Sequence, residues 1–220
     1  MARDRAAAGT GPELVATRPD TRTQLLDVAE RLFAERGIDA VSLSEILETA
    51  GQRNKSAIYY HFGSKEALIA AIAERRSQAL NERRSQLLAD ARATGGGDVH
   101  AIAGTLVVPL AELLDDPDNY YLGFLARYHL DRSRRQLVDS VDPQVTSSYR
   151  AAGRLLRSAA GLPNVDFDTR YGLVLDMIFT ALAGRQEAER LSSQRVPSRR
   201  VFINNLIECV AGAFAQPARG

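Results

Sequence analysis

The sequence predicts an all-α protein, and three observations support that prediction. Apolar residues recur at helical spacing over most of the chain, as they do on the buried face of an amphipathic helix. Glycine and proline interrupt this pattern where helices would end and turns would begin. No stretch alternates apolar and polar residues in the way that predicts a half-buried strand, and no internal repeat is present.

The chain begins with an arm and a first helix. Residues 1–19 mix glycine, proline, small and charged residues without a sustained period, which predicts a flexible arm. A helix is expected directly after this arm, because Thr21 and Gln24 have the spacing of a capping box. Its apolar residues stay on one face for about four turns, until Gly37 provides the stop.

Two shorter helices are predicted next. Ser42 and Glu45 repeat the capping-box spacing, and a short apolar stripe follows until Gly51. A third helix is expected from Asn54, as its cap, to Phe62. This helix is weakly apolar and rich in hydrogen-bonding side chains.

The rest of the chain is predicted to be helical as well. A helix from Ser64 to about Ala93 is far longer than the average of about 11 residues and could link two lobes. Glycine and proline divide the remainder into helical segments near residues 98–115, 118–133, 142–160, 167–192 and 197–215.

The composition excludes several classes of protein. Apolar residues make up 45% and charged residues 25% of the 220 positions, as in an ordinary globular protein. The longest apolar stretches fall short of the roughly 20 residues that a membrane-spanning helix needs, and the N-terminus lacks the apolar core of a secretory signal. We therefore expect a cytoplasmic protein with no membrane partner. Its single cysteine, Cys209, is expected to be buried, because its sequence neighbours include none of the cations that activate a thiol.

An enzyme is not expected. The three histidines, His61, His100 and His129, do not have the spacing of a metal site. Neither a glycine-rich phosphate loop nor the glycine-flanked serine of a nucleophile elbow occurs. We therefore predict no catalytic residue, no metal and no cofactor.

A short basic segment indicates DNA binding, although the net charge of the chain is only +1. Two short helices joined by a glycine turn, with a helix before them in support, form a helix-turn-helix, whose second helix can enter the major groove. The segment from Gly51 to Lys65 contains three cations and no carboxylate, so its local field attracts phosphate. The cations are Arg53, Lys55 and Lys65, and the neutral donors among them are Asn54, Ser56, Tyr59, Tyr60 and His61.

The same part of the chain resembles the DNA-binding signature of the TetR family. The resemblance covers roughly residues 21–69 and rests on Ser42–Ile46, on Ala50–Gly51 and above all on Ile58–Leu68. It implies a three-helix DNA-binding lobe followed by a helical lobe of diverse sequence that binds a small-molecule effector. It also implies dimerisation through the last two long helices, and repression that ends when the effector binds.

The resemblance also implies which residues touch DNA. The matching positions are Ser42, Ser44, Asn54, Lys55, Ser56, Tyr59, Tyr60, His61 and Lys65, and we add Arg53 as the cation of the turn. Taken alone, each has a simpler explanation: a lysine is usually solvated, and Tyr59 or His61 can pack within a lobe. Between Gly51 and Tyr59 this chain has one residue more than the commonest family spacing. A longer turn is therefore expected, and which of residues 53–57 face bases stays open.

The C-terminal half offers a candidate effector site in its densest aromatic cluster. Tyr121, Phe124 and Tyr128 share one face of a predicted helix, and such a face is more often core than pocket. Our hypothesis is that part of this stripe lines an apolar cavity, with Arg127 or His129 as a polar contact. The sequence does not identify the effector.

Broad apolar faces in the last two segments predict a homodimer. Such faces can also complete a monomeric core, but one helix-turn-helix makes too few base contacts for tight specific binding. Two copies related by a two-fold axis would read a palindromic operator in double-stranded DNA. The expected organisation is an arm over residues 1–19, a helix-turn-helix domain over 20–68, and a helical ligand-binding and dimerisation domain over 69–220.

The predicted function is that of a ligand-responsive, sequence-specific DNA-binding transcriptional regulator. A repressor that a small molecule releases from its operator is the form we expect, although an activator stays open. The alternative is a helical adaptor or ligand carrier that has the same fold and does not read DNA. Salt dependence separates the two, because DNA binding falls steeply as the salt concentration rises.

Overall fold

The computed structural model describes residues 20–54, 56–130, 143–191 and 196–217. This part of the chain is helical and contains no strand, so the all-α prediction is confirmed. None of its helices has an apolar stretch long enough to span a bilayer. The helices are α1 (Thr21–Arg36), α2 (Leu43–Thr49), α3 (Ala57–Phe62), α4 (Lys65–Ala93), α5 (Val99–Ala111), the 3₁₀ helix η1 (Glu112–Asp115), α6 (Tyr121–Leu130), α7 (Ser147–Ala160), α8 (Asn164–Leu191) and α9 (Arg199–Ala215).

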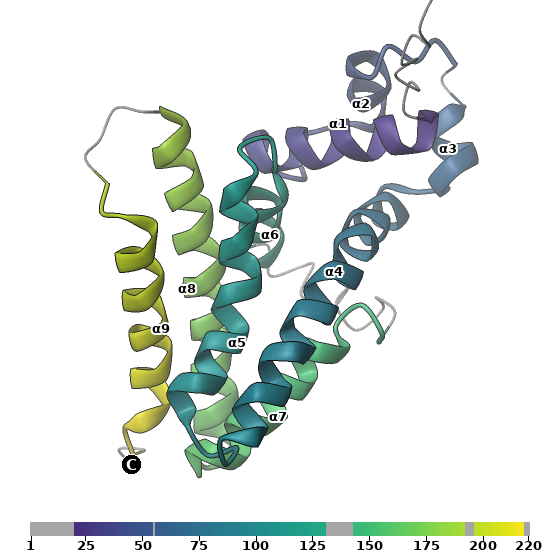
Figure 1. The fold of residues 1–220 in the computed structure, drawn as a ribbon. Coiled ribbons are helices and arrows are strands. Elements are labelled where there is room, and N and C mark those ends of the chain that lie inside the picture. The colour runs from purple at the N-terminus through teal and green to yellow at the C-terminus, as the bar shows by residue number, and fades with distance from the viewer. Residues whose placement is uncertain (1–19, 55, 131–142, 192–195, 218–220) are drawn as a thin grey trace, which may run out of the picture.

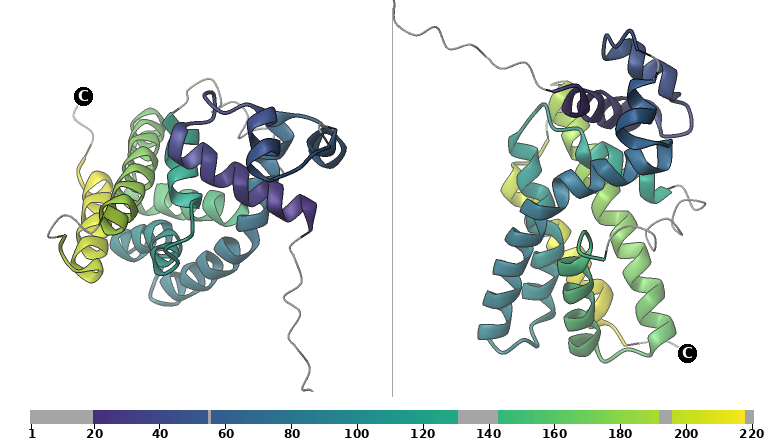
Figure 2. Two further views of the ribbon diagram at one scale, coloured as in Figure 1. Left: turned by 90° about the horizontal axis from the view of Figure 1, so that it is seen from above. Right: turned by 90° about the vertical axis from the view of Figure 1, so that its right-hand side faces the viewer.

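The helices form two lobes that share α4 and α6. Helices α1, α2 and α3 make a small lobe at the top of Figure 1, and α4 runs from it down into the larger lobe of α5 and α7–α9. Helix α1 lies across the top of the larger lobe, where it packs on α6. Helices α8 and α9 lie side by side at the edge of the larger lobe, as all views show (Figures 1 and 2).

Side chains at the first two helix starts cap the backbone, with one correction. The cap of α1 is Asp20, whose Oδ1 accepts from the backbone N–H of Thr23 at 2.6 Å, and not Thr21. The prediction was one residue late because Asp20 already reaches the orphan donors of the first turn. Ser42 caps α2 as predicted, accepting from the N–H of Glu45 at 3.2 Å.

Helix α3 begins two residues later than predicted, because its N-cap is Ser56 and not Asn54. The side chain of Asn54 does not cap a helix, because its Oδ1 accepts from the N–H of Ser56 at 2.9 Å and forms a tight turn. The carbonyl of Asn54 accepts from the N–H of Ala57 at 3.0 Å, so helical geometry starts only there. Gly63, with φ of 79°, ends the helix as its left-handed backbone allows.

Within the described residues, each predicted C-terminal segment contains a helix, with shifted boundaries, whereas residues 131–133, 142 and 192 of the predicted segments lie outside the described residues. Helix α6 starts at Tyr121 because Asn119 Oδ1 accepts from the N–H of Tyr121 at 2.9 Å, which satisfies the first turn from outside. Helix α8 starts directly after Pro163, earlier than the apolar pattern suggested. The predicted arm over residues 1–19 lies outside the described residues.

Two hydrophobic cores hold the lobes together. One is built from α1–α4 and takes in Tyr121, Phe124 and Tyr128 of α6. The other is built from α4–α9, with Phe167 and Phe214 among its fully buried side chains. Helix α6 therefore belongs to both lobes, which matters for the site below.

The expectation that Cys209 is buried is wrong. Its side chain is exposed, because the core-facing positions of α9 are taken by the residues before and after it. Those residues are Leu206, Ile207, Val210 and Ala211. The helical period leaves position 209 on the opposite face.

Candidate functional site

Most of the predicted DNA-binding residues are exposed in and around α2 and α3. Helix α3 lies at the outer end of the small lobe, away from α8 and α9 (Figure 1). The exposed members of the predicted set are Ser42, Ser44, Arg53, Asn54, Ser56, Tyr59 and Tyr60, and His61 is half-buried. Lys55 lies outside the described residues.

Helix α3 has one packed side and one open side. Ala57 and Ile58 are buried in the core of the small lobe and hold the helix in place. Tyr59 and Tyr60 are 60% and 87% exposed, which is unusual for side chains with so much apolar surface. Their rings and hydroxyls are therefore free to meet a partner, and the ring of Tyr60 rests edge-on against His61 at 5.2 Å between centroids.

Lys65 has a second role inside the lobe. Its Nζ donates to the carbonyl of Val41 at 2.6 Å and lies 5.7 Å from the centre of the Phe33 ring. This contact joins the start of α4 to the connection between α1 and α2. The ammonium is part-buried, so it differs from the fully exposed members of the set.

Arg22 is a surface cation near α3 that the sequence reading missed. Its guanidinium carbon lies 5.2 Å from the centre of the Phe62 ring, and the residue is exposed. Hydrogen bonds from Thr23 hold the pKa of the neighbouring Asp20 below its ordinary value, with smaller contributions from Arg22 and His61. No spacing rule relates position 22 to position 62, so only the fold could bring them together.

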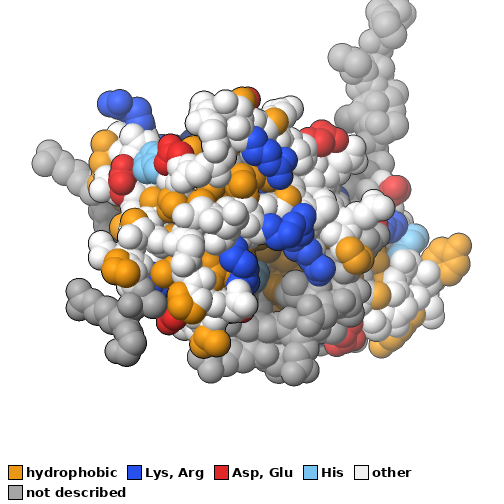
Figure 3. Space-filling view, turned by 90° about the horizontal axis from the view of Figure 1, so that it is seen from below, with side chains coloured by type: hydrophobic (Ala, Val, Ile, Leu, Met, Phe, Trp, Pro, Cys, Tyr) orange, Lys and Arg blue, Asp and Glu red, His pale blue; other side chains and the backbone are white. Residues whose placement is uncertain are grey.

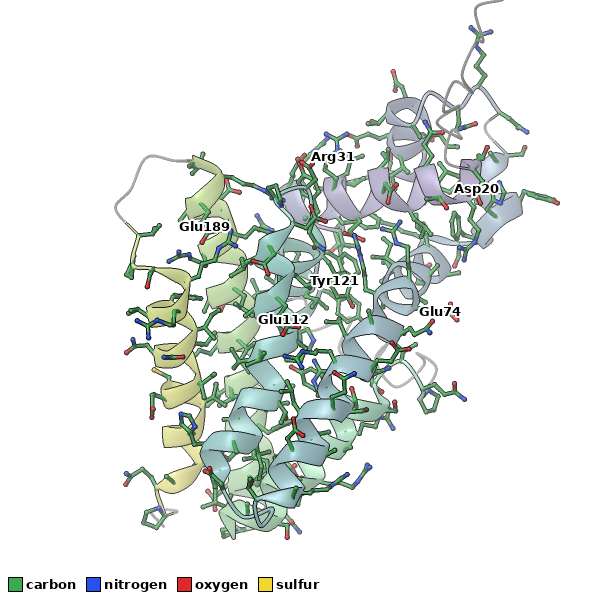
Figure 4. All side chains as sticks on the ribbon, in the orientation of Figure 1. Asp20, Arg31, Glu74, Glu112, Tyr121 and Glu189 are labelled. Atoms are coloured by element: carbon green, nitrogen blue, oxygen red, sulfur yellow. The ribbon has the colours of Figure 1, made fainter. Side chains whose placement is uncertain are left out.

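A cavity of about 520 Å³ lies beneath the small lobe, between α4, α6, α7 and α8. Four residues of the predicted effector set line it: Tyr121, Phe124, Tyr128 and His129. Arg127 does not, because it is exposed on the other side of α6. Figure 4 shows Tyr121 in the space beneath α1, between the two lobes.

The aromatic stripe of α6 is both core and cavity wall. Tyr121 stacks on Phe124 at 5.7 Å between ring centroids, and Phe124 stacks on Tyr128 at 6.0 Å. On its other side, Phe124 contacts Phe33 of α1 at 6.4 Å. A molecule in the cavity would therefore touch side chains that also pack against the DNA-binding lobe.

The polar side of the cavity was missed. Arg84 of α4 is only 2% exposed and lines the cavity together with Tyr149 of α7. A sign of it was present in the sequence, since Arg84 lies four residues after Leu80 and four before Leu88, on the apolar face of its helix.

Polar contacts fasten α1 to α4 beside this cavity. Glu30 is 2% exposed, and its carboxylate accepts from Arg75 at 2.7 Å and from Arg76 at 2.9 Å.

Within the described ranges, no cluster of three or more histidine, cysteine or acidic residues could hold a metal ion. The two candidate surfaces are thus the exposed side of α2–α3 and the cavity below it.

Comparison with known proteins identifies the helix-turn-helix. Residues 25–72 match the family described as bacterial regulatory proteins, tetR family. A segment of 51 residues is 47% identical to the HTH-type transcriptional repressor KstR2 of Rhodococcus jostii (strain RHA1), covering 23% of this chain and 24% of that protein. A segment of 55 residues is 46% identical to the HTH-type transcriptional regulator AcrR of Shigella flexneri, covering 25% of each chain. The similarity thus spans about a quarter of the length of these curated relatives.

Solved structures resemble the whole fold. A putative tetR family transcription regulator from Shewanella sp. PV-4 has a TM-score of 0.62 at 16% identity, over 89% of this chain and 98% of that one. The ketosteroid transcriptional regulator KstR2 of Mycobacterium tuberculosis has a TM-score of 0.56 at 16% identity, over 91% and 97%. At such identities the likeness concerns the fold alone. Residues 25–72 thus match the tetR family of bacterial regulatory proteins, and the fold resembles that of the compared regulators over nearly the whole length of the chain.

Proposed function

We propose that this protein is a sequence-specific, DNA-binding transcriptional repressor that a small-molecule effector releases from its operator. The observation that carries the proposal is α3, a short helix anchored by buried Ala57 and Ile58 that exposes Tyr59 and Tyr60. No carboxylate interrupts the segment from Gly51 to the end of this helix. A chromosomal operator also implies a cytoplasmic protein.

The proposed contacts fall into two kinds. Side chains at the start of α3 and in the turn before it suit base edges, because the first turn of a recognition helix enters the major groove. They are Arg53, Asn54, Lys55 and Ser56. Hydroxyls and cations around them suit phosphate oxygens, which position the protein. They are Ser42, Ser44, Tyr59, Tyr60, His61 and Lys65, with Arg22 added by the fold.

The proposed dimer forms through the outer face of α8 and α9. This face exposes Leu173 (65%), Leu191 (62%) and Val201 (45%), which is a large apolar surface for a monomer. Gly184 and Gly212 lie in the same two helices, and a Cβ atom at either would meet nothing within 4 Å. Small residues on an open helix face let a second helix approach closely. Each chain would contribute one reading head, the lobe of α1, α2 and α3. A two-fold dimer would present its two reading heads to half-sites about 34–36 Å apart, or a multiple of that distance.

Coupling between effector and DNA is proposed to pass through α6. Tyr121 and Phe124 line the cavity and also belong to the core of the small lobe. Gly123, between them, lies so close to α1 that a Cβ atom there would be 3.0 Å from Cβ of Ala34. An effector that displaces α6 would therefore move α1 and the reading head attached to it. Its effect on DNA affinity equals the difference in its affinity for the two arrangements.

Charge removal on α2–α3 tests the proposal. Arg53→Gln should weaken binding to an operator duplex and reduce the slope of log affinity against log salt by about 1 if Arg53 contacts a phosphate. The matched control is Arg92→Gln, which removes the same charge from an exposed position in the last turn of α4. Fluorescence anisotropy at several salt concentrations measures both. Salt-independent binding, or equal effects of the two substitutions, would support the adaptor alternative.

A further inference from the structure

The cavity contains a buried cation whose charge no described carboxylate balances. Arg84 Nε donates to the carbonyl of Thr105 at 3.1 Å, and Nη1 donates to Ser148 Oγ at 3.0 Å. Both acceptors are neutral. The guanidinium carbon lies 4.3 Å from the centre of the Tyr149 ring, and Nη2 has no hydrogen-bond partner among the described residues.

The other buried arginine of the larger lobe is arranged differently. Arg185 is 7% exposed, and its Nε donates to the carboxylate of Glu189 at 2.5 Å. Burial lowers the pKa of Arg84, and the ionisable groups that oppose this shift are tyrosines. An unpaired buried charge is costly in a folded protein, so an anion that reached Arg84 would offset that cost.

A second polar atom beside Arg84 is also unsatisfied. The hydroxyl of Tyr149 is buried without a hydrogen-bond partner in the described part of the chain. Burial raises the pKa of Tyr149 to about 12, so its hydroxyl keeps its proton and can donate. Arg84 and Tyr149 line the same cavity, and they contact each other through the cation–π interaction.

Apart from one aspartate and a few neutral polar side chains such as Ser77, Asn81 and Thr146, the rest of the cavity lining is apolar, aromatic or basic. Its other arginines are Arg150, Arg154 and Arg157, all on α7. Asp168 is the one acidic residue among the described lining residues, and it already pairs with Arg157. Figure 3 shows Lys and Arg side chains gathered beside hydrophobic ones on the lower face of the molecule. A ligand entering this cavity therefore meets positive potential and aromatic walls.

We propose that the effector is an amphipathic organic anion whose carboxylate accepts hydrogen bonds from Arg84 Nη2 and the Tyr149 hydroxyl, with its apolar body along the α6 aromatic stripe. A single carboxylate matches Arg84, the one buried arginine of this cavity that lacks an acidic partner among the described residues. The volume of about 520 Å³ lies within the range of about 300–1,000 Å³ usual for small-molecule sites. This inference rests on the proposed effector site and specifies its ligand.

Matched pairs of probes test the inference with the full-length protein in the absence of DNA. Decanoate, dodecanoate and naphthoate are each compared with the alcohol of the same skeleton by titration calorimetry. At least one carboxylate should bind about tenfold or more tightly than its alcohol, as expected for one charge-assisted hydrogen bond. If every alcohol binds as well as its carboxylate, or no carboxylate binds, the inference is overturned.

Substitutions then locate the anion. Arg84→Met should reduce the carboxylate-to-alcohol affinity ratio to about one, whereas Arg84→Lys, which keeps the charge, should retain a preference. If Arg84→Met does not fold, the carboxylate-to-alcohol affinity ratios of Arg84→Lys and of the wild type still test the inference. If Arg154→Met abolishes the preference and Arg84→Met leaves it unchanged, the anion binds at the α7 arginines and the inference is wrong. Operator binding is measured separately, so the regulator proposal can stand when this inference fails.

Discussion

At the residue scale, the surface around α3 separates side chains that hold the lobe from side chains that are free for a partner. Tyr60 is 87% exposed and supports no core contact that would require an aromatic ring there. Lys65, from the same sequence motif, donates to the carbonyl of Val41 within the lobe. The two residues should therefore respond to substitution in opposite ways.

Tyr60→Ala should weaken operator binding while changing the free energy of unfolding by no more than about 0.5 kcal/mol, as for other exposed positions. Lys65→Met should instead lower the free energy of unfolding by about 1 kcal/mol, because it removes a part-buried hydrogen bond. Urea unfolding and anisotropy titration on the same samples measure both quantities. A loss of stability in Tyr60→Ala equal to that in Lys65→Met would contradict this division of roles.

The exposure of most residues proposed to bind DNA is consistent with the sequence, because their positions follow from local spacing around Gly51 and Gly63. Arg84 could not be assigned in the same way. Its partners Thr105 and Ser148 come from α5 and α7, and only the packing of three helices makes its environment dry. A charged residue on an apolar face was the one sign available, and it does not say what the residue meets.

At the element scale, the presence of each helix could be predicted from the apolar periodicity of the sequence. The first residue of a helix, in contrast, depended on single hydrogen bonds. Asp20, Asn54 and Asn119 each bond a nearby backbone N–H, and each moved a boundary by one to three residues from its predicted place. Asparagine and aspartate compete in this way with helical hydrogen bonding. The contact of α6 with α1 lay beyond prediction, because a glycine at position 123 gives no sign of its partner helix.

The close approach of α6 to α1 predicts opposite effects for two glycine substitutions. Gly104→Ala should stabilise the protein by about 0.5–1 kcal/mol, since alanine favours a helix interior and a Cβ atom there meets nothing within 4 Å. Gly123→Ala should destabilise it, because its Cβ would lie 3.0 Å from Ala34 Cβ. Thermal unfolding of both variants measures the contrast. Equal stabilisation by both would show that α6 and α1 are not in tight contact.

Glu189 near the C-terminal end of α8 predicts a pH dependence (Figure 4). Hydrogen bonds from Arg199 and then Arg185 hold its pKa below the ordinary value of 4.5. A depressed pKa in the folded state means that the stabilisation is fully present above pH 4.5 and is lost as the pH falls from there through the folded-state pKa. Glu189→Gln should therefore be less stable than wild type at pH 7, with a difference that shrinks in acid.

Thermal unfolding of wild type and variant from neutral to acidic pH measures this difference. The matched control is Glu74→Gln, which neutralises an exposed carboxylate in the middle of α4. A stability gap between Glu189→Gln and wild type that stays constant down to strongly acidic pH would contradict the assigned pairing.

At the scale of the whole molecule, the proposed function requires two chains. Leu173→Arg places a charge at an exposed apolar position of α8 and should convert a dimer to monomers. Operator affinity should fall with it, since one reading head makes too few base contacts. Ala79→Arg adds the same side chain to an exposed position of α4 and should leave the dimer intact. Analytical ultracentrifugation distinguishes the two outcomes, and a wild-type monomer would contradict the proposed interface.

Selection of binding sites from random DNA duplexes by the purified protein tests whether α2 and α3 read DNA. We expect enrichment of a palindrome whose half-sites have the spacing of a two-fold dimer, and affinity for it that falls steeply as the salt concentration rises. Tyr60→Ala should enrich it less. No enrichment above background, or binding that salt does not weaken, would contradict the claim that α2 and α3 read DNA.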